Sequence, residues 1–187
     1  MFNKGDKIII KTVADNEIYF AKIRESAKIP TKKLEDAGYD VYADFEGDYF
    51  VVEPGKTRPV PTGIAIAFSP KYYIQVEERG SMAKLGIKKS GGVFDSGYRG
   101  EYLIMTYNTN DKPFVISNRP LDEVPTTFDI AGQTYYRDDV ILYPSAKAIC
   151  QLVLQEVPVL EEREISYEEL VSISSERGAG RFGSSGK

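Results

Sequence analysis

The chain contains no histidine, and this absence narrows the chemistry that it can perform. Ser-His-Asp and Cys-His catalysis both use an imidazole as general base, and many metal centres use imidazole ligands. Neither arrangement is available within these 187 residues. A reaction at this protein must therefore use carboxylates, lysine, arginine or tyrosine side chains, or a metal ion that is held by oxygen atoms.

Cysteine is almost absent as well, and long apolar runs are missing. Cys150 is the single cysteine, which rules out an intramolecular disulfide bond and a cysteine-rich zinc site and fits a reducing compartment. No apolar run approaches the roughly 18 residues of a membrane span, and Met1 begins no signal-like segment. We therefore expect a cytoplasmic protein without a membrane partner.

The charge balance is mildly acidic. Lysine and arginine number 24 and aspartate and glutamate 28, which gives a net charge of −4. A protein that binds duplex nucleic acid normally presents a basic face, so we expect no direct nucleic-acid contact. A few cations can still hold a small anionic ligand. Because 42% of the residues are hydrophobic, the composition is that of a folded protein, and the length suits one domain with appendages.

Short β-rich segments with turn residues between them recur along most of the chain. Pro54-Gly55, residues 61–63 and Ser69-Pro70 mark turns, and helical turns are expected only at residues 81–86 and 166–171. The pattern is typical of an all-β sandwich or jelly roll. The expected strands cover residues 6–12, 18–23, 38–43, 49–52, 57–60, 63–68, 72–76, 102–107 and 148–157, of which the first two form a hairpin over about residues 1–20.

About forty residues separate the last two expected strands, whereas paired strands usually need about two to five linking residues. Within this excursion, residues 126–130 and 133–137 predict a short extra hairpin. A long excursion is either functional or without structure, and Tyr135 and Tyr136 favour an ordered segment.

Residues 91–100 read Gly-Gly-Val-Phe-Asp-Ser-Gly-Tyr-Arg-Gly, and four glycines in this decapeptide permit close backbone approach to a ligand. A tight turn of this kind can hold a nucleotide base against main-chain groups, with Asp95 beside the sugar and Tyr98 beneath it. Taken alone, the segment is more typical of a β-hairpin with an Asp-Ser-Gly turn.

The tail, residues 174–187, is rich in glycine and serine, and its composition leaves two interpretations open. One is a frayed chain end. The other is an arm that grips phosphate, because arginines and serines alternate with glycines around Phe182 and the backbone N–H groups of such a loop bind anions.

Together, five segments resemble one family, the trimeric dUTPases, which are deoxyuridine triphosphate nucleotidohydrolases. The segments are Ala37-Gly-Tyr-Asp-Val41, Glu78-Arg-Gly-Ser-Met-Ala83, residues 91–100, Ile149-Cys-Gln-Leu-Val153 and Arg177-Gly-Ala-Gly-Arg-Phe-Gly-Ser-Ser-Gly186. The resemblance runs from about Ile23 to Gly186 without the excursion. It implies a β-clip jelly roll that hydrolyses dUTP to dUMP and pyrophosphate, and a homotrimer whose sites each take motifs from three subunits.

The resemblance implies a role for each residue of the 91–100 segment. Asp95 would orient and deprotonate the water that attacks the α-phosphorus, which suits a chain without histidine. Tyr98 would pack under the deoxyribose, where a 2′-hydroxyl would clash. The main chain around Gly92, Val93 and Phe94 would pair with the uracil edge.

The second, first and fourth segments imply phosphate and metal contacts. Arg79, Gly80 and Ser81 resemble the phosphate-binding segment, and Gln151 would add an amide donor unless it is an ordinary polar strand residue. Asp40 resembles the acid that reaches a triphosphate-bound Mg²⁺ through water, although it could instead brace the neighbouring loop.

In the tail, the resemblance implies an arm over residues 174–187 that follows a domain over residues 1–173. Arg177, Gly183, Ser184 and Ser185 would bind the terminal phosphates, and Phe182 would stack on uracil.

The chain departs from the family pattern at four positions. Residues 79–81 read Arg-Gly-Ser in place of the usual Arg-Ser-Gly, and Lys89 stands where an asparagine commonly contacts the nucleoside. Leu103 replaces a frequent polar residue, and Ala148 replaces an arginine. These changes bear on the affinity for the nucleotide. They leave the expected general base, Asp95, and the C-terminal arm in place.

Two rival functions remain open. A dCTP deaminase has a similar fold, but that chemistry needs a glutamate where this chain has Met105. A non-catalytic regulatory role is the other rival, because some phage members of the family carry an insert at the place of residues 109–147 and bind repressors. We expect an enzyme of phage type that can also bind a repressor or another regulatory protein through this insert.

Overall fold

The computed structural model describes residues 12–176, 178 and 179. Two units are distinguished, one that ends at Val157 and one that begins at Pro158. The strands are β1 (Ile18–Lys22), β2 (Tyr39–Val41), β3 (Tyr49–Val52), β4 (Thr57–Val60), β5 (Ile64–Phe68), β6 (Tyr72–Glu78), β7 (Ile87–Lys89), β8 (Val93–Asp95), β9 (Ile104–Asn108), β10 (Phe114–Ser117), β11 (Thr127–Ile130), β12 (Gln133–Tyr136), β13 (Ile141–Pro144) and β14 (Cys150–Glu156). The helices are α1 (Gly80–Lys84), α2 (Tyr167–Ser172) and the 3-10 turn η1 (Arg137–Asp139).

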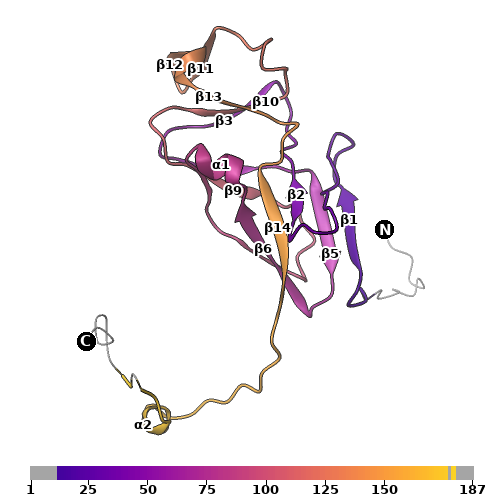
Figure 1. Ribbon diagram of the computed structural model, residues 1–187, viewed down its shortest axis with the longest axis vertical. Helices are drawn as coiled ribbons and strands as arrows, with labels where there is room; N and C mark the ends of the chain where they lie inside the picture. Colours follow the sequence, from indigo (N-terminus) through magenta and orange to yellow (C-terminus); the bar gives the residue numbers. More distant parts are fainter. Residues whose placement is uncertain (1–11, 177, 180–187) are drawn as a thin grey trace, which may run out of the picture. The chain divides into compact units, whose positions relative to one another are not determined.

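The first unit is built from small sheets of mostly antiparallel strands (Figure 1). The largest has the order β2-β14-β6-β8, and β4-β9-β7 and β13-β10-β3 form two further sheets. Strand β1 pairs with β5, and β11 pairs with β12. This architecture confirms the expected all-β fold of the jelly-roll or sandwich type.

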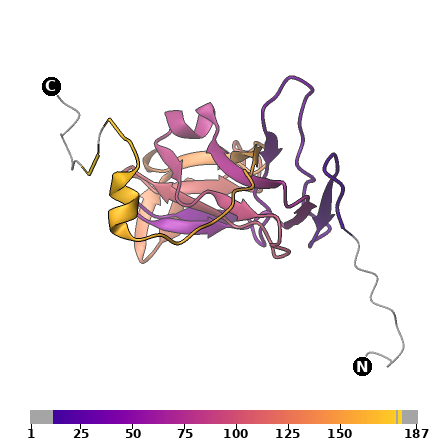
Figure 2. The same cartoon turned by 90° about the horizontal axis from the view of Figure 1, so that it is seen from below.

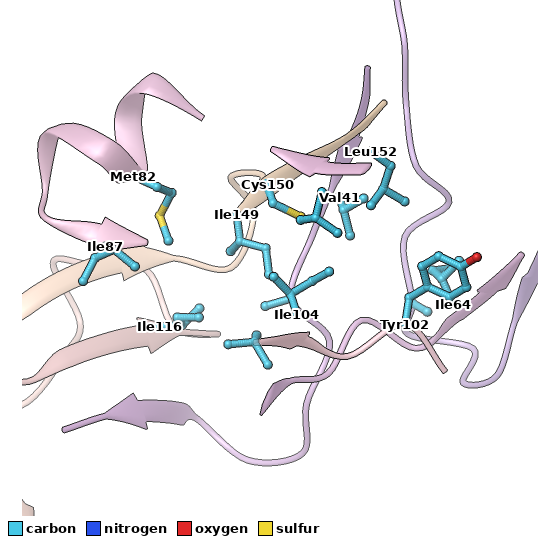
Figure 3. Close-up of a cluster of buried hydrophobic side chains, with 14 of the residues drawn as sticks. Val41, Ile64, Met82, Ile87, Tyr102, Ile104, Ile116, Ile149, Cys150 and Leu152 are labelled. Atoms are coloured by element: carbon cyan, nitrogen blue, oxygen red, sulfur yellow. The ribbon is translucent and has the colours of Figure 1, made fainter. Parts of the chain in front are cut away.

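Alternating apolar residues place one face of each strand in a common core. In β5, Ile64, Ile66 and Phe68 are buried while the two alanines between them are partly exposed, which is the period of two that a half-buried strand requires. Helix α1 stands out from the strands in the turned view of Figure 2 and contributes the buried Met82. Figure 3 shows Met82 near Ile87 and Ile149, so the helix is held against the sheets by this side chain.

Strand β10 lies between two hydrophobic cores. Phe114 and Ile116 belong to the main core, and Val115 packs in a second core with Phe128 and Val140. All four residues of β10 are buried, so the strand lacks the alternation by which the others were predicted. The excursion at residues 109–147 therefore contains two strands of the main fold, β10 and β13, and the β11–β12 hairpin between them was correctly expected.

Other strand predictions agree with the structure within a few residues, but β7 and β8, which have three residues each, were missed. Residues 1–11 lie outside the described residues, which leaves the opening hairpin a prediction, and β1 has β5 as its described partner.

In the second unit, α2 begins with the expected capping box, in which Ser166 and Glu169 exchange side-chain and backbone hydrogen bonds. Over the described part of the chain, no helix has the length and apolar character that crossing a bilayer would need.

Candidate active site

Strand β8 presents Asp95 at its last position. The strand pairs with β6 so that Asp95 stands opposite Tyr73, and the N–H of Val76 donates to the carbonyl oxygen of Gly92 at 2.7 Å. The carbonyl of Asp95 in turn accepts from the N–H of Tyr98 at 3.1 Å, so the turn begins at this residue rather than before it. The Asp95 side chain is exposed, and its carboxylate has no hydrogen-bond partner among the residues that the structure describes.

The glycines of this segment serve different purposes. Gly91 has φ +93°, a conformation that side chains disfavour. At Gly92, a Cβ atom would lie 2.8 Å from Nε2 of Gln75 and 3.1 Å from Nζ of Lys89, so the missing side chain makes room for these two polar groups. At Gly100, a Cβ atom would lie 2.5 Å from the Tyr98 hydroxyl, which explains how this ring can fold back over the turn.

A hollow of about 160 Å³ lies beside the loop. The segment from Gly92 to Phe94, which was expected to contact the base, forms one wall, and the exposed side chains of Leu103 and Met105 on and before β9 form another. Lys89 lies next to this wall, where its Nζ is 3.5 Å from Glu77 Oε2. The hollow therefore offers main-chain groups at one side and apolar surface at the other.

The Tyr98 ring rests on a buried aromatic stack. Its centroid lies 5.9 Å from that of Phe94, whose ring stacks on Tyr102 at 4.1 Å. Tyr98 is 42% exposed whereas Tyr102 is fully buried, and burial raises the pKa of the Tyr102 hydroxyl. The Tyr98 hydroxyl donates to the carbonyl oxygen of Glu101 at 2.9 Å, so the ring is held at its outer end as well as over its face.

A second group of expected site residues meets across β14 and β2. Gln151 stands opposite Asp40, and its Nε2 donates to Asp40 Oδ1 at 3.1 Å. The guanidinium of Arg79 donates to Asp40 Oδ2 at 2.8 Å. The neighbouring Cys150 is buried, which raises the pKa of its thiol and makes it an unreactive group. Strand pairing thus brings together three residues that lie far apart in the sequence.

Arg79 also borders a larger hollow of about 390 Å³ together with Ser81. The Ser81 hydroxyl lies 3.3 Å from that of Tyr143, which donates to the carbonyl oxygen of Ala148 at 2.8 Å. Gly80 is exposed at the start of α1. The sequence reasoning missed Lys147, which lines the same hollow, although its position next to Ala148, where the family pattern has arginine, was the available signal.

Within one chain, these two groups lie at different places along β6. Asp95 is opposite Tyr73, whereas Gln151 is opposite Glu77, and four residues of strand span roughly 13 Å. The structure therefore brings Asp40, Arg79 and Gln151 together, and separately Asp95 and Tyr98, without joining the two groups. Arg177 and residues 182–185 lie outside the described residues.

The group formed by Asp40, Arg79 and Gln151 contains one carboxylate that a metal ion could contact, that of Asp40. Among the described residues, no cluster of three or more histidine, cysteine, aspartate or glutamate side chains could enclose a cation. Mg²⁺ usually keeps several waters and takes one or two carboxylates plus substrate phosphates. Asp40 is partly exposed with Arg79 and Gln151 on its oxygens, so it fits an ion that a triphosphate brings with it and that it reaches through water.

Comparison with known proteins gives the family. The dUTPase family model matches residues 24–120, which is just over half of the chain. The chain belongs to the dUTPase family. The deoxyuridine 5'-triphosphate nucleotidohydrolase of Debaryomyces hansenii is 32% identical over 165 residues, which cover 87% of this chain and 83% of that protein. The Pol polyprotein of an ovine maedi visna related virus is 35% identical over 101 residues, and the chain spans 9% of that relative's length.

Solved structures agree with the fold of this dUTPase family member. The dUTPase of Staphylococcus bacteriophage 80alpha, solved with dUPNHPP, has a TM-score of 0.66 and 22% identity and covers 92% of this chain and 99% of its own. The dUTPase of S. aureus phage phi11, which has a species-specific insert, has a TM-score of 0.58 and 21% identity and covers 80% of this chain and 96% of its own. The matched family segment includes β10, which confirms that this strand belongs to the main fold.

Proposed function

We propose that this protein hydrolyses dUTP to dUMP and pyrophosphate. The observation that carries the proposal is its membership of the dUTPase family, together with relatives that are dUTP nucleotidohydrolases. The carboxylate of Asp95, exposed at the end of β8, takes a proton from water as the water oxygen bonds to the α-phosphorus. The bond from the α-phosphorus to the bridging oxygen breaks, and pyrophosphate leaves with the electron pair.

Selectivity for deoxyuridine follows from the walls around Asp95. The main chain from Gly92 to Phe94 offers fixed donors and acceptors to the uracil edge, because its strand is pinned to β6. The Tyr98 ring lies under the sugar and leaves no room for a 2′-hydroxyl. Lys89 stands at the edge of this wall and contributes a cation near the nucleoside.

The triphosphate binds the other group of residues. Arg79 and Ser81 supply charged and neutral donors at the border of one hollow, with Gly80 between them in the sequence. The amide of Gln151, which contacts Asp40, supplies a further neutral donor. Mg²⁺ bound to the triphosphate would neutralise phosphate charge, and Asp40 would orient it through a water ligand. A phi11 phage dUTPase has a structural Mg²⁺ ion, which supports a role for this metal in the fold.

The separation of the two groups within one chain supports assembly as a homotrimer. A copy that places its Arg79 group beside the Asp95 loop of its neighbour would complete the site. Arg177, Phe182, Gly183, Ser184 and Ser185 would close it from a third copy. The proposed place of action is the cytoplasm, that of a bacterial host if the protein is phage-encoded.

One assay tests this function. Purified protein is incubated with dUTP, dCTP, dTTP or UTP, with and without Mg²⁺, and pyrophosphate and ammonia are measured. We expect pyrophosphate from dUTP alone, in a Mg²⁺-dependent manner, and its loss in Asp95→Asn. Ammonia from dCTP would instead support the deaminase, and no product from any nucleotide would leave the regulatory role.

A second function rests on the insert (residues 109–147), and within it on the segment between β10 and β13, residues 118–140. Its Val124, Phe128 and Ile130 pack in a small core that it shares with Val115 of β10, and it exposes Tyr136 at 68%, so it can offer an ordered surface to a protein. Phage 80alpha dUTPases control transfer of virulence genes, which supports a repressor as the partner. Replacing residues 122–137 by a short linker should abolish repressor binding and spare dUTP hydrolysis; loss of both would make the insert structural.

A further inference from the structure

A network of ion pairs lies behind the Asp95 loop without touching the proposed ligand hollows. The Arg24 guanidinium donates from NH2 to Glu101 Oε1 at 2.6 Å and from NH1 to Glu101 Oε2 at 3.2 Å. Its Nε donates to Asp44 Oδ2 at 2.7 Å, and NH2 also reaches the Asp44 carbonyl oxygen at 2.8 Å. One arginine therefore holds two carboxylates, in the bidentate geometry that guanidinium groups favour.

Glu101 is further held by main-chain donors. Its Oε1 accepts from the N–H groups of Gly63 at 2.7 Å and Thr62 at 3.1 Å. Gly63 has φ +65°, and a Cβ atom there would lie 2.4 Å from Asp44 Oδ2 and 2.6 Å from Ala27 Cβ. The glycine thus gives room for the network. The network joins four chain segments that are distant in sequence, at residues 24, 44, 62–63 and 101.

The backbone around Glu101 is equally constrained. The hydroxyl of Thr62 donates to the carbonyl oxygen of Tyr102 at 2.7 Å. The N–H of Tyr102 donates to the carbonyl oxygen of Ile64 at 2.9 Å. The carbonyl oxygen of Glu101 is the acceptor for the Tyr98 hydroxyl. A rigid Glu101 therefore presents a fixed anchor for the ring that the proposed function places under the sugar.

We infer that Arg24 and Glu101 are positioning residues whose ion pair holds Tyr98 in place and so sets the discrimination between deoxyribose and ribose. This inference rests on the proposed dUTP hydrolysis and adds to it two residues that do not touch substrate. When the pair is loosened, the carbonyl anchor shifts, the Tyr98 ring gains freedom, and a 2′-hydroxyl finds room.

A double-mutant cycle tests the coupling. Tyr98→Phe removes the hydrogen bond to Glu101 and keeps the ring, and Arg24→Lys keeps a charge but cannot bridge both carboxylates. For each variant and for the double variant, kcat/KM is measured with dUTP and with UTP, and Tm is recorded. We expect each single change to lower the dUTP:UTP ratio about fivefold, the effect of one ordinary hydrogen bond, and the double variant to lower it no further than the larger single effect.

Arg119→Ala is the matched control, because Arg119 also holds a carboxylate, that of Asp48 at 2.7 Å, away from Tyr98 and Glu101. It should leave the ratio unchanged. If Arg24→Lys does not fold, Glu101→Gln replaces it, since the amide oxygen can still accept from Gly63 and Thr62.

The outcomes separate the two claims. A wild-type protein that hydrolyses neither nucleotide contradicts the proposed function, and the inference falls with it. An active wild type whose ratio is unchanged in Arg24→Lys while Tm falls shows that the ion pair only stabilises the fold. If the two changes multiply their effects on the dUTP:UTP ratio in the double variant, Arg24 acts by a route that does not pass through the Tyr98 hydroxyl. Either this result or the unchanged ratio overturns the inference and leaves the proposed function standing.

Discussion

The two halves of the proposed site are built in different ways. The Asp95 half lies within a ten-residue segment, where a three-residue strand, a turn and an aromatic stack place the base and the sugar platform. The Arg79 half joins three segments far apart in sequence through strand pairing and two polar contacts to Asp40. The residues of the first half come from one segment, although its strand β8 also pairs with β6. The second half needs β14 to pair with both β2 and β6 before its three segments meet.

Asp95→Asn should have the largest effect of any single change in either half. Loss of a positioned general base typically costs about 10²- to 10⁴-fold in rate, so kcat for dUTP should fall by that range with little change in KM. Because the carboxylate is exposed and has no hydrogen-bond partner among the described residues, Tm should stay the same. Retention of more than roughly a tenth of the wild-type kcat would rule out Asp95 as the base.

Gly63→Ala tests the support behind the Asp95 half. The new methyl group would meet Asp44 and Ala27 at distances that real Cβ atoms do not show, and the backbone has a left-handed conformation. We expect a loss of about 3 kcal/mol or more in the free energy of unfolding, measured by urea denaturation. Gly55→Ala is the matched control, because Gly55 has φ +66° with nothing within 4 Å, and it should cost only about 1 kcal/mol. Equal losses would show that the space around Gly63 does not matter.

Arg79→Ala breaks the other half. The variant should raise KM for dUTP by about 10- to 100-fold, the range of one charge-assisted hydrogen bond to phosphate, with a smaller change in kcat. Arg79→Lys should recover only part of the affinity, since an ammonium cannot replace the fork of the guanidinium. Steady-state kinetics measure both values. An unchanged KM would remove Arg79 from the phosphate site.

Acid should weaken the support of the Asp95 half by a smaller amount. Hydrogen bonds from Arg24 and from the N–H groups of Gly63 and Thr62 hold the pKa of Glu101 below its ordinary value of 4.5, and Asp44 is the other acid facing Arg24. The folded state therefore binds fewer protons, so this stabilisation is complete above pH 4.5 and is lost as the pH falls below it. Between pH 7 and pH 4, wild type should lose more unfolding free energy than Glu101→Gln. Equal losses in urea denaturation would contradict this assignment.

The same difference between local and distant construction decided what the sequence could predict. The capping box at Ser166 and the hairpin at residues 127–136 follow from neighbouring residues and were found. Strand β10 was missed because it is buried on both faces, which removes the alternating pattern, and it lies within the predicted excursion at residues 109–147. Alternation of apolar and polar residues identifies strands that have one buried and one exposed face, and it misses strands that are buried on both faces.

The family motifs predicted most residues of the candidate site, but the sequence did not predict which of these residues contact one another. The contacts of Asp40 with Arg79 and Gln151 depend on the register between β2 and β14. The Arg24–Glu101 ion pair joins residues 77 positions apart, and neither residue lies in a pattern that marks it as paired. Such contacts become visible only when the strands are placed in space.

The central claim is that Asp95 and Arg79 of one chain serve different sites, and mixing two impaired variants tests it most directly. Asp95→Asn, which lowers kcat, and Arg79→Ala, which raises KM, are unfolded together, refolded at equal concentrations, and assayed for pyrophosphate release at a dUTP concentration below the wild-type KM. If each site takes Asp95 and Arg79 from different copies, every mixed trimer has one intact site, and random assembly restores about a quarter of wild-type activity. Activity no greater than the average of the two separate variants would show that both residues act within a single chain and would contradict the account.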